Sequence, residues 1–370
     1  MTAAPPHILI ALNRLGSGGV ERVTLHLANG FARRGNRVTL ALVSPGGPLE
    51  HRLDPEVRVV SIGNGRAVER GLGLLRAVRP LAKLVRVLRP DVLLSPGNHT
   101  SVLVTLAHGW ARAGDVGLAL KLTNPVERAG AGHIHNRVRR RLFRSAAGAA
   151  DVLLTLSEAA RSEAAKIAPS GAAKLKTVVN PYIDDALLSR PPGSRPPDDA
   201  APMLLSVGRL TEQKDPLMML DAVGGLADRQ WRLVMIGEGP LQQACIDRAA
   251  ALGIADRVQF AGFIADPQPY FEQARLFLLS SRYEELPAVL FEAAAAGVPI
   301  VATAASASIE QLFTQMDGVR IVPPGDVQPF RSAVAEALDR PPPPPIARES
   351  LEKFSISNGI ASHAAALGLR

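Results

Sequence analysis

Hydrophobic residues at the start of the chain alternate between short runs and helical spacing. His7–Leu12 is an apolar run of strand length, and a glycine-rich turn follows it. From Val20 to Arg34 the apolar residues recur every three or four positions, and Gly35 ends the pattern as a C-terminal glycine would. Val38–Val43 is a second apolar run. This order of strand, turn, helix and strand predicts the opening of a parallel α/β unit.

The same alternation continues along the chain and is interrupted once, at residues 190–202. This segment contains prolines and charged residues and has no apolar period, so it predicts a linker. Near the end, Pro341–Pro345 predicts a stiff extended spacer, and residues 346–369 predict a helical tail. The expected strands are His7–Leu12, Val38–Val43, Val57–Ile62, Asp91–Ser95, Leu118–Leu122, Asp151–Leu156, Met203–Gly208, Trp231–Gly237, Val258–Ala261, Leu276–Leu279 and Pro299–Ala302. The expected helices are Val20–Arg34, Leu72–Leu88 with a kink at Pro80, Ser101–Ala111, Asn136–Arg144, one capped by Ser157, Pro216–Leu226, Leu241–Leu252 and Leu286–Ala296.

Two such alternations predict two doubly wound, Rossmann-like α/β domains. We expect the first over residues 1–189, the linker over 190–202 and the second over 203–345, with 346–370 as a final helix. In such sheets ligands bind at the carboxyl ends of the strands. Two domains that face each other would therefore place a site in the cleft between them.

The composition indicates a folded protein without a disulfide framework. The chain has 370 residues, of which 47% are apolar and 21% charged, and it contains one cysteine, Cys245. These values exclude a disordered chain and a cysteine-rich zinc module. The apolar runs are far shorter than the ~20 residues that span a bilayer, and residues 1–6 lack the features of a signal peptide. We therefore expect a cytoplasmic protein, soluble or peripheral to the membrane.

Positive charge is concentrated in the first part of the chain. Residues 1–144 contain 22 Lys and Arg against 8 Asp and Glu, whereas the remainder contains 20 against 26. The asymmetry predicts an anionic partner for the first half: a nucleic acid, an anionic membrane surface or a phosphorylated substrate. A GC-rich genome, which favours arginine, would produce part of the same bias. With 4% aromatic residues and no recognition helix, nucleic acid is the weakest of these candidates.

Two loops after expected strands have the composition of phosphate sites. In Gly16-Ser17-Gly18-Gly19-Val20-Glu21, glycines at the start of a helix would let backbone amides approach a phosphate, although a tight turn explains them equally well. In Gly208–Lys214, Arg209 and Lys214 follow a strand five residues apart. Two cations there could hold a diphosphate and stabilise its charge as it leaves, the alternative being two solvated surface cations.

A third motif places two carboxylates eight residues apart, at Glu284 and Glu292. Pro287 between them suits the first position of a helix. The amides of the next three residues would then be free to face an anion, and the carboxylates could bind sugar hydroxyls. The alternative is a helix-terminal charge plus one exposed glutamate. The residues with expected free amides are Ala288, Val289 and Leu290.

Other motifs are weak or missing. Gly237-Glu238-Gly239-Pro240 resembles half of a dinucleotide loop, and a turn is the simpler interpretation. The chain has no Asp-x-Asp, no P-loop and no Gly-x-Ser-x-Gly motif, which argues against the usual metal-bridged diphosphate, a P-loop NTPase and a serine hydrolase. His133 and His135 stand two apart beside a basic helix, and this spacing is weak support for a metal site.

Taken in order, these motifs resemble the retaining glycosyltransferases of family 4, which have the two-domain GT-B fold. The resemblance covers residues 7–365. It rests on seven elements in the right order, none of them decisive alone. They are Gly18-Gly19-Val20-Glu21 with Arg34-Gly35, Ser157-Glu158, Asn180-Pro181, Gly208-Arg209 with Lys214, Gly237-Glu238-Gly239-Pro240, Phe260-Ala261-Gly262 and Glu284 with Glu292.

The resemblance implies a role for each matching residue. Arg209 and Lys214 match the pair that binds the donor diphosphate, Glu284 the residue that contacts the transferred sugar, and Glu292 the one that holds the ribose. The last helix would return to the first domain. The remaining positions match family residues that contact the donor through glycines, through backbone amides or as the seat of the nucleobase. They are Gly18, Gly19, Gly208, Gly237, Phe260, Gly262, Ala288, Val289 and Leu290.

Two positions depart from the family pattern. After the first glutamate the family often has glycine, and this chain has Glu285. Where many members have a sugar-contacting histidine after the strand that ends here in Lys121-Leu122, this chain has Thr123 and Asn124. His99 is the nearest substitute, so His99 and Asn124 are candidate contacts for the sugar or the acceptor. These departures predict an altered sugar specificity or a weakened enzyme.

The resulting prediction is a cytoplasmic, retaining glycosyltransferase that moves a hexose or N-acetylhexosamine from a nucleotide sugar to a lipid-linked glycan. We expect UDP rather than GDP as the donor nucleotide, no required cofactor or metal, and a setting in polysaccharide or lipopolysaccharide synthesis. The alternatives are a nucleotide-sugar epimerase and a catalytically weakened binding protein of the same fold. An anionic membrane partner is expected from the basic residues of the first half, namely Arg137, Arg139, Arg140, Arg141, Arg144 and the helix Arg76–Arg89.

Overall fold

The computed structural model describes residues 4–16, 18–63, 72–127, 132–189 and 201–369. It divides into two compact units, one formed by Met1–Tyr182 with Phe354–Arg370 and the other by Ile183–Lys353. The chain thus passes between the units at Tyr182 and again at Lys353, rather than at the expected positions 189, 203 and 345. Residues 190–200 of the expected linker lie outside the described residues.

The first unit is built on a seven-stranded parallel sheet with the order β3-β2-β1-β4-β5-β6-β7. All six residues of β1 are buried, because helices cover both faces of a parallel sheet and leave no polar side. Ile8 of β1 pairs with Val38 of β2 and with Val92 of β4, which places β1 at the centre. The strands are β1 His7–Leu12, β2 Arg37–Leu42, β3 Arg58–Ser61, β4 Val92–Ser95, β5 Gly117–Lys121, β6 Val152–Thr155 and β7 Leu175–Thr177.

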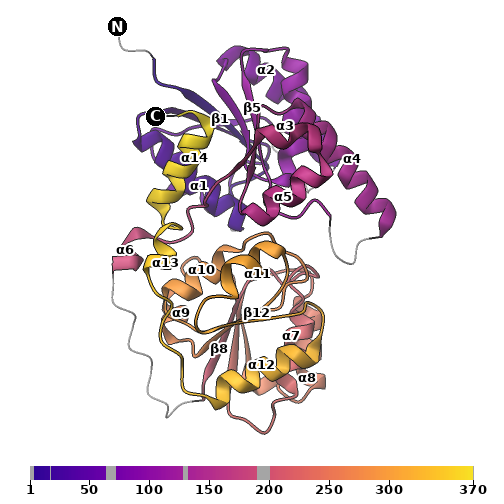
Figure 1. Cartoon of the computed structure of the whole chain (residues 1–370), viewed down its shortest axis with the longest axis vertical. Coiled ribbons are helices and arrows are strands. Elements are labelled where there is room, and N and C mark those ends of the chain that lie inside the picture. Colours follow the sequence, from indigo (N-terminus) through magenta and orange to yellow (C-terminus); the bar gives the residue numbers. More distant parts are fainter. Residues whose placement is uncertain (1–3, 17, 64–71, 128–131, 190–200, 370) are drawn as a thin grey trace. The chain divides into compact units, whose positions relative to one another are not determined.

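Helices pack on both faces of this sheet (Figure 1). Helices α2, α3, α4 and α5 bury their apolar residues in one cluster on one face, and α1 and α14 contact each other on the opposite face. A Cβ on Gly30 of α1 would lie 2.2 Å from Ile360 Cδ1 of α14, so this close packing requires glycine. The helices are α1 Gly19–Arg33, α2 Val78–Leu88, α3 Asn98–Ala111, α4 His133–Ala149, α5 Glu158–Ile167 and α14 Ile356–Leu367, with 3₁₀ turns at Glu50–Arg52, Leu72–Ala77 and Pro169–Lys174.

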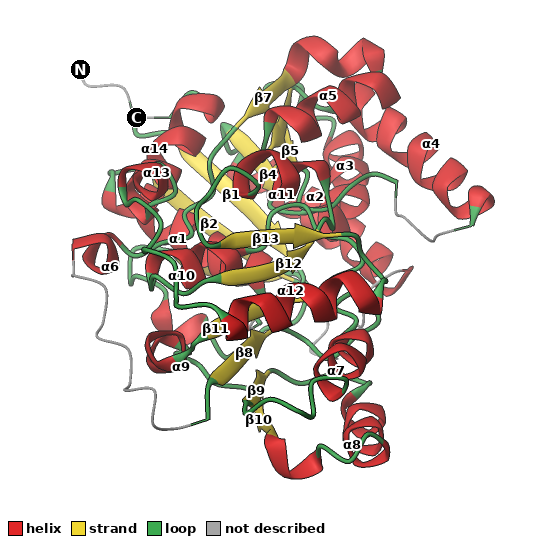
Figure 2. Cartoon of the chain, turned by 60° about the horizontal axis from the view of Figure 1, so that its bottom comes forward, coloured by secondary structure: helices red, strands yellow, loops and turns green. Residues whose placement is uncertain are grey.

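The second unit repeats the plan with a six-stranded parallel sheet of order β10-β9-β8-β11-β12-β13 (Figure 2). One cluster of buried residues in its core includes Trp231 and Phe330, and other buried residues, such as Phe291 and Phe313, lie outside that cluster. The strands are β8 Met203–Val207, β9 Arg232–Ile236, β10 Val258–Gly262, β11 Leu276–Leu279, β12 Ile300–Thr303 and β13 Val319–Val322. The helices are α6 Asp185–Ser189, α7 Pro216–Gly224, α8 Gln242–Ala251, α9 Gln268–Gln273, α10 Ala288–Ala295, α11 Ala307–Phe313, α12 Val327–Asp339 and α13 Glu349–Glu352, with a 3₁₀ turn at Ala255–Arg257.

In both sheets the strand order reverses beside the first strand. The reversal lies between β1 and β4 in the first unit and between β8 and β11 in the second. At such a switch point the connections leave in opposite directions and open a crevice at the carboxyl ends of the strands. The two doubly wound sheets confirm the predicted fold class. They also direct attention to the residues after β1, β4, β8 and β11.

Some predicted details were wrong. Pro80 does not kink a long helix, because α2 begins at Val78 and Pro80 falls in its first turn, where a backbone N–H has no partner to lose. Pro287 is not the first helical residue of α10 but its N-cap, with extended dihedral angles. The helical tail is two helices, broken where Ser355 caps α14. Ser157 does cap α5, accepting a hydrogen bond from the Ala160 amide at 2.9 Å.

Candidate active site

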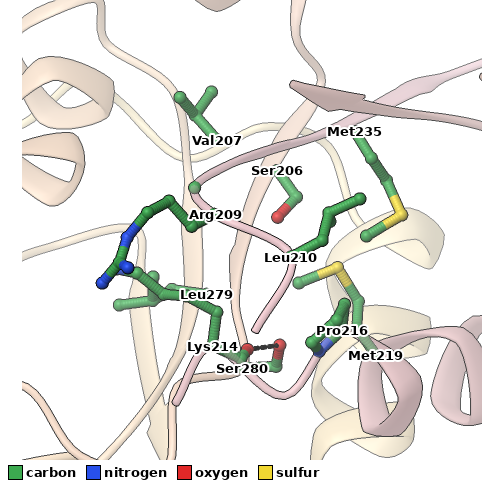
Figure 3. A pocket seen from close by; sticks show the side chains of 11 residues that line it. Ser206, Val207, Arg209, Leu210, Lys214, Pro216, Met219, Met235, Leu279 and Ser280 are labelled. Carbon is green, nitrogen blue, oxygen red and sulfur yellow. Dashed lines mark hydrogen bonds between the residues drawn. The ribbon is translucent and has the colours of Figure 1, made fainter. Parts of the chain in front are cut away.

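A small pocket lies at the switch point of the second sheet, where β8 and β11 end (Figure 3). The loop after β8 supplies Arg209 and Lys214, and both side chains line this one pocket. Arg209 is exposed and Lys214 is half-buried. Both cations therefore lie at one pocket, and their joint action on a diphosphate stays a prediction. The other lining residues are Ser206, Val207, Gly208, Leu210, Pro216, Met219, Met235, Leu279 and Ser280.

Lys214 forms an ion pair with Glu284. The Lys214 Nζ to Glu284 Oε1 distance is 2.5 Å, and the two side chains are 18% and 11% exposed, so solvent screens the pair only partly. The same Oε1 accepts hydrogen bonds from Gln213 Nε2 at 3.3 Å and from Ser281 Oγ at 3.5 Å. Among the described residues, the hydrogen bonds to this carboxylate all reach Oε1. Oε2 is therefore the oxygen available to a ligand.

Residues that the sequence analysis missed hold the loop after β8 against the end of β11. Ser280 Oγ donates to the carbonyl oxygens of Lys214 and Asp215 at 2.8 and 3.0 Å. Arg282 Nε donates to Asp215 Oδ2 at 2.8 Å, and the Arg282 amide donates to the Gln213 carbonyl. Asp215 itself adopts left-handed dihedral angles, with φ of 47°, at the N-terminus of α7. These contacts fix the direction in which Lys214 leaves the loop.

The N-terminus of α10 offers fewer amides than expected. The Leu290 amide donates to the Pro287 carbonyl at 3.2 Å, so the prediction that it faces an anion was wrong. The reason is the later helix start, which makes this bond part of the first turn. Ala288 and Val289 remain as the amide donors of a helix N-terminus, where the helix dipole also favours an anion.

The three neighbouring glutamates of this region are all buried, yet they do different things. Glu284 and Glu292 are each 8% exposed, Glu284 before α10 and Glu292 in its second turn. Glu285, which departs from the family pattern, is 3% exposed and turns away to α11, where it accepts a hydrogen bond from Ser308 Oγ. Its carbonyl accepts from Ser306 Oγ at 2.7 Å. Glu285, the residue that departs from the family pattern, therefore anchors the loop before α10 to α11.

Glycines shape the loops around the pocket. A Cβ on Gly208 would lie 3.4 Å from Lys214 Cε, which is ordinary contact. A Cβ on Gly237 would lie 2.1 Å from the Gly208 carbonyl oxygen, and Gly237 has φ of +133°. Only glycine fits there. Gly237 thus sets the shape of the pocket loop by close packing, and its predicted contact with the donor stays a prediction.

The aromatic residue predicted to seat a nucleobase is only partly available. Phe260 is half-buried and packs against the hydrophobic core of the second unit, and its role as a nucleobase seat stays a prediction. Phe263, three residues later and past the end of β10, is 45% exposed. Gly262 lies between them with φ of +66°, and its carbonyl accepts from the Gly237 amide at 2.7 Å. Phe263 is the exposed ring at the carboxyl edge, and the sequence analysis did not select it.

The first unit places its predicted residues at its own switch point. Gly18 is the N-cap of α1 and Gly19 its first residue, whereas Ser17 lies outside the described residues. A Cβ on Gly18 would lie 2.4 Å from Glu21 Oε2, so the carboxylate of Glu21 folds back over this helix terminus. A phosphate at this terminus would meet that negative charge. The diphosphate contact of Gly18 and Gly19 therefore remains a prediction.

Asn98 joins the ends of β4 and β5. Its Oδ1 accepts from the backbone amides of Thr123 and Asn124 at 2.6 and 3.1 Å, and its Nδ2 donates to the Asn124 carbonyl at 3.1 Å. A Cβ on Gly97 would lie 3.0 Å from Thr123 Oγ1 and 3.4 Å from His99 Nδ1, so His99 also lies at this edge. The structure thus brings the candidates His99 and Asn124 together. Asn98, which positions one of them, was missed.

Two general features are absent from the described part of the chain. No helix there is both long and apolar enough to cross a bilayer. No group of three or more histidines, cysteines, aspartates or glutamates is arranged there to hold a metal ion, and His133 and His135 gain no third ligand.

Comparisons with known proteins give the same assignment for both units. Residues 18–182 match the family model described as a glycosyl transferase 4-like domain, and residues 201–340 match the model described as glycosyl transferases group 1. The lipopolysaccharide core biosynthesis glycosyltransferase LpsE of Rhizobium meliloti is 25% identical over 87% of this chain and 86% of its own length.

A second relative, from Campylobacter jejuni, is 24% identical over 75% of this chain and 74% of its own. Its name describes an α-1,4-N-acetyl-D-galactosaminyltransferase that acts on a diNAcBac-PP-undecaprenol glycan. Among solved structures, HepE of Anabaena, in complex with UDP and glucose, superposes with a TM-score of 0.73 at 18% identity over 98% of this chain and 95% of that one. The two family matches, together with this likeness of fold, show that the chain belongs to the group 1, family 4-like glycosyltransferases and is a transferase with the two-domain, Rossmann-like GT-B fold.

Proposed function

We propose that this glycosyltransferase moves a hexose or N-acetylhexosamine, with retention of configuration, from a UDP-sugar to a lipid-linked glycan during synthesis of cell-surface polysaccharide. The names of the relatives support the setting, since one makes lipopolysaccharide core and one extends a glycan on PP-undecaprenol. A UDP donor is supported by the likeness of fold to a protein solved with UDP and glucose.

The observation that carries the proposal is the pocket shared by Arg209 and Lys214 at the β8–β11 switch point. A nucleoside diphosphate gains negative charge as it leaves the sugar. Two cations held in place before the reaction stabilise that charge more in the transition state than in the ground state. The ion pair with Glu284 and the loop contacts of Asp215 fix the position of Lys214.

The glutamates fit the sugar parts of the same donor. Oε2 of Glu284 is the oxygen that can accept a hydrogen bond from a hydroxyl of the transferred sugar, and it belongs to the same carboxylate as Oε1, which holds Lys214. Glu292 on α10 is the second acceptor, for ribose hydroxyls. The Ala288 and Val289 amides at the start of the same helix would then receive the phosphate between these two carboxylates.

A reaction that retains the anomeric configuration does not need a strong base from the protein. The bond from the anomeric carbon to the β-phosphate oxygen breaks, the acceptor oxygen bonds to that carbon on the same face, and the acceptor proton passes to the leaving phosphate oxygen. Charge stabilisation by Arg209 and Lys214 suffices for this route, and the proposal therefore requires no divalent metal.

The test is transfer by the full-length protein from UDP-glucose, UDP-N-acetylhexosamines and GDP-mannose to polyprenyl-diphosphate-linked glycans. Product anomers are read by proton NMR, with and without EDTA. The expected result is an acceptor-dependent α-linked product from a UDP-α-sugar in EDTA. Arg209→Ala and Lys214→Ala should lose it, while Arg232→Ala should keep it, because Arg232 begins β9 at the opposite edge of the same sheet. An inverted product overturns retention, and full activity in both variants overturns the site.

A further inference from the structure

The loop after β5, residues 122–127, is held at both ends by neighbouring elements of the first unit. At its start the Leu122 amide donates to the Leu154 carbonyl after β5's neighbour β6 begins, at 2.9 Å. At its other end Arg139 Nε of α4 donates to the Val126 carbonyl at 2.8 Å. Asn124 lies between these two anchors. The loop therefore has a fixed path on either side of a residue that stands where many family members have a histidine.

Asn98 holds the middle of this loop through both ends of its side-chain amide. Its Oδ1 accepts hydrogen bonds from the Thr123 amide at 2.6 Å, from Thr123 Oγ1 at 3.2 Å and from the Asn124 amide at 3.1 Å. Its Nδ2 donates to the Asn124 carbonyl at 3.1 Å. The reverse orientation of the Asn98 amide would set Nδ2 against two N–H donors, so the partners determine the orientation. One side chain thus binds both the N–H and the C=O of Asn124 and fixes the backbone direction there.

Buried hydroxyl groups support the turn that carries Asn98. Asn98 is the first residue of α3 and follows Gly97, the N-cap. Ser95 Oγ, which is fully buried, donates to the Gly97 carbonyl at 3.1 Å and lies 2.9 Å from Thr100 Oγ1. A Cβ on Gly97 would lie 3.1 Å from Val20 Cγ1, so this turn adjoins the start of α1 at the β1–β4 switch point. Asn98 is therefore a supported side chain at the edge where doubly wound sheets bind ligands.

An amide at this edge offers a different contact from the histidine of many family members. The Asn124 side chain has one acceptor and two donors and carries no charge, whereas a histidine changes its charge near a pH of about 6.5. A sugar hydroxyl both donates and accepts, so an amide can meet it with a matched pair of hydrogen bonds. Such a contact aids the reaction only if the group is held in place before the substrate arrives, because small misplacements lower the rate by large factors. Asn98 supplies that constraint.

We propose that Asn98 is a positioning residue for the transfer reaction: it holds both backbone groups of Asn124 and thereby directs the Asn124 amide at a hydroxyl group of the substrate sugar. The pair replaces the histidine contact of many family members with an uncharged one, so the departure from the family pattern is compensated and does not weaken the enzyme. The inference rests on the function proposed above and adds a residue that acts on the substrate only through another. Hydroxyls of the transferred sugar and of the acceptor offer the same chemistry, and the kinetics below distinguish them.

Transfer kinetics of the full-length protein test this role, with a UDP-sugar and a polyprenyl-diphosphate-linked glycan as substrates. Asn124→Ala and Asn98→Ala should each lower kcat/KM by about tenfold or more. In the double variant the loss should stay within about twofold of the larger single loss, because Asn98 acts through Asn124. A loss confined to the KM of the glycan places the hydroxyl on the acceptor. A loss that persists at saturating glycan places it on the transferred sugar.

Two further variants separate positioning from stability. Asn98→Asp keeps an acceptor for both amides and loses the bond to the Asn124 carbonyl, so it should fold and show part of the loss in kcat/KM. Asn29→Ala is the matched control, because Asn29 Nδ2 donates to the Arg52 carbonyl at 2.9 Å and its Oδ1 accepts from the Asp54 amide at 3.0 Å. These partners precede β3, on the amino side of the same sheet. Asn29→Ala should therefore lower Tm by an amount similar to Asn98→Ala and keep kcat/KM within about twofold.

The pH profile of Asn124→His gives a signature that a purely structural role would not produce. This substitution places a group with a pKa of about 6.5 at the proposed contact. The plot of kcat/KM against pH should then acquire a limb near that value that the wild-type profile lacks. Stabilisation by UDP should be the same in all of these variants as in wild type, because the pocket of Arg209 and Lys214 belongs to the second unit.

Three results would overturn the inference. One is an Asn98→Ala protein with a lower Tm and an unchanged kcat/KM, because the contacts would then serve stability alone. Another is a pair of losses that multiply in the double variant, because the two residues would then act independently. The third is an Asn124→His profile that matches that of wild type. Each of these leaves the proposed function standing, whereas a wild-type protein that transfers no sugar from any donor would refute the proposed function and this inference together.

Discussion

Replacing Lys121 with methionine is expected to stabilise the protein. Lys121 ends β5 in the centre of the first sheet and is fully buried. Among the described residues its Nζ has no hydrogen-bond partner. Burial without a counter-charge disfavours the ammonium form, and it lowers the pKa of Lys121 to about 7 from 10.5. Methionine has a similar length and removes the amine.

The size of the destabilisation caused by Lys121 follows from the difference between its pKa in the unfolded state and its pKa in the folded state. Because the folded pKa is lower, the folded protein binds fewer protons between about pH 7 and 10.5, and its stability rises with pH across that window. At about 1.4 kcal/mol per pKa unit, the full destabilisation below pH 7 is about 5 kcal/mol. Between pH 9 and pH 7 the wild-type protein should lose about 2 kcal/mol of its free energy of unfolding.

The buried His363 of α14 adds a separate effect at lower pH. Burial first, and then the charge of Lys121, hold the pKa of His363 well below its usual 6.5. Its folded pKa is also lower than its unfolded pKa, so this contribution to stability is present above pH 6.5 and is lost as the pH falls below that value. Measurements between pH 7 and 9 therefore report on Lys121 rather than on His363.

The assay is urea unfolding followed by circular dichroism at pH 7 and pH 9. Lys121→Met should be several kcal/mol more stable than wild type at pH 7. Its free energy of unfolding should differ much less between pH 7 and pH 9 than that of wild type. Lys166→Met, at an exposed lysine of α5, serves as the control and should retain the wild-type pH dependence. The reasoning is refuted if Lys121→Met keeps the 2 kcal/mol slope, or if it is less stable than wild type at pH 7.

Further predictions concern the pocket and the packing of α14. Lys214→Ala should lower kcat/KM at least 100-fold and should also lower Tm, because it leaves the buried Glu284 carboxylate without its counter-charge. Gln213→Ala, which loses one bond to the same carboxylate, should lower kcat/KM less than tenfold in the same transfer assay. Gly237→Ala should lower both Tm and nucleotide affinity in thermal melts, because its Cβ would lie 2.1 Å from a loop carbonyl oxygen. Gly30→Ala should lower Tm, corresponding to about 1–3 kcal/mol of overpacking, and Ile360→Ala in the same chain should restore part of it, because the two side chains compete for one space.

The sequence predicted those elements whose period is undisturbed. β11 lies where its apolar run stands, at Leu276–Leu279, and the β1–α1–β2 unit was found within one residue at each boundary. β13 was missed because Arg320 interrupts its short edge run. α12 was missed because Pro329 stands in its first turn, where a proline does not break a helix but obscures its start in the pattern.

Of the candidate site, the sequence identified the residues with local motifs and not those that act over long separations. Arg209 and Lys214 are five apart in one loop and were found. Arg282 and Asp215 are 67 residues apart, and only the fold shows that they meet. Asn98 and Asn124 likewise lie on different strand ends. Likewise, only the fold shows that Phe260, the predicted nucleobase seat, is half-buried against the core of the second unit.

The central claim is that Arg209 and Lys214 hold the diphosphate of the donor, and nucleotide-dependent thermal melting in EDTA tests it most directly. Wild type and Arg232→Ala should be stabilised by UDP, by about 2.7 kcal/mol at 100 times the Kd. Arg209→Ala and Lys214→Ala should show little or none of that stabilisation at the same concentration. No stabilisation of the wild type by UDP, GDP or ADP, or equal stabilisation of all four proteins, would contradict the account.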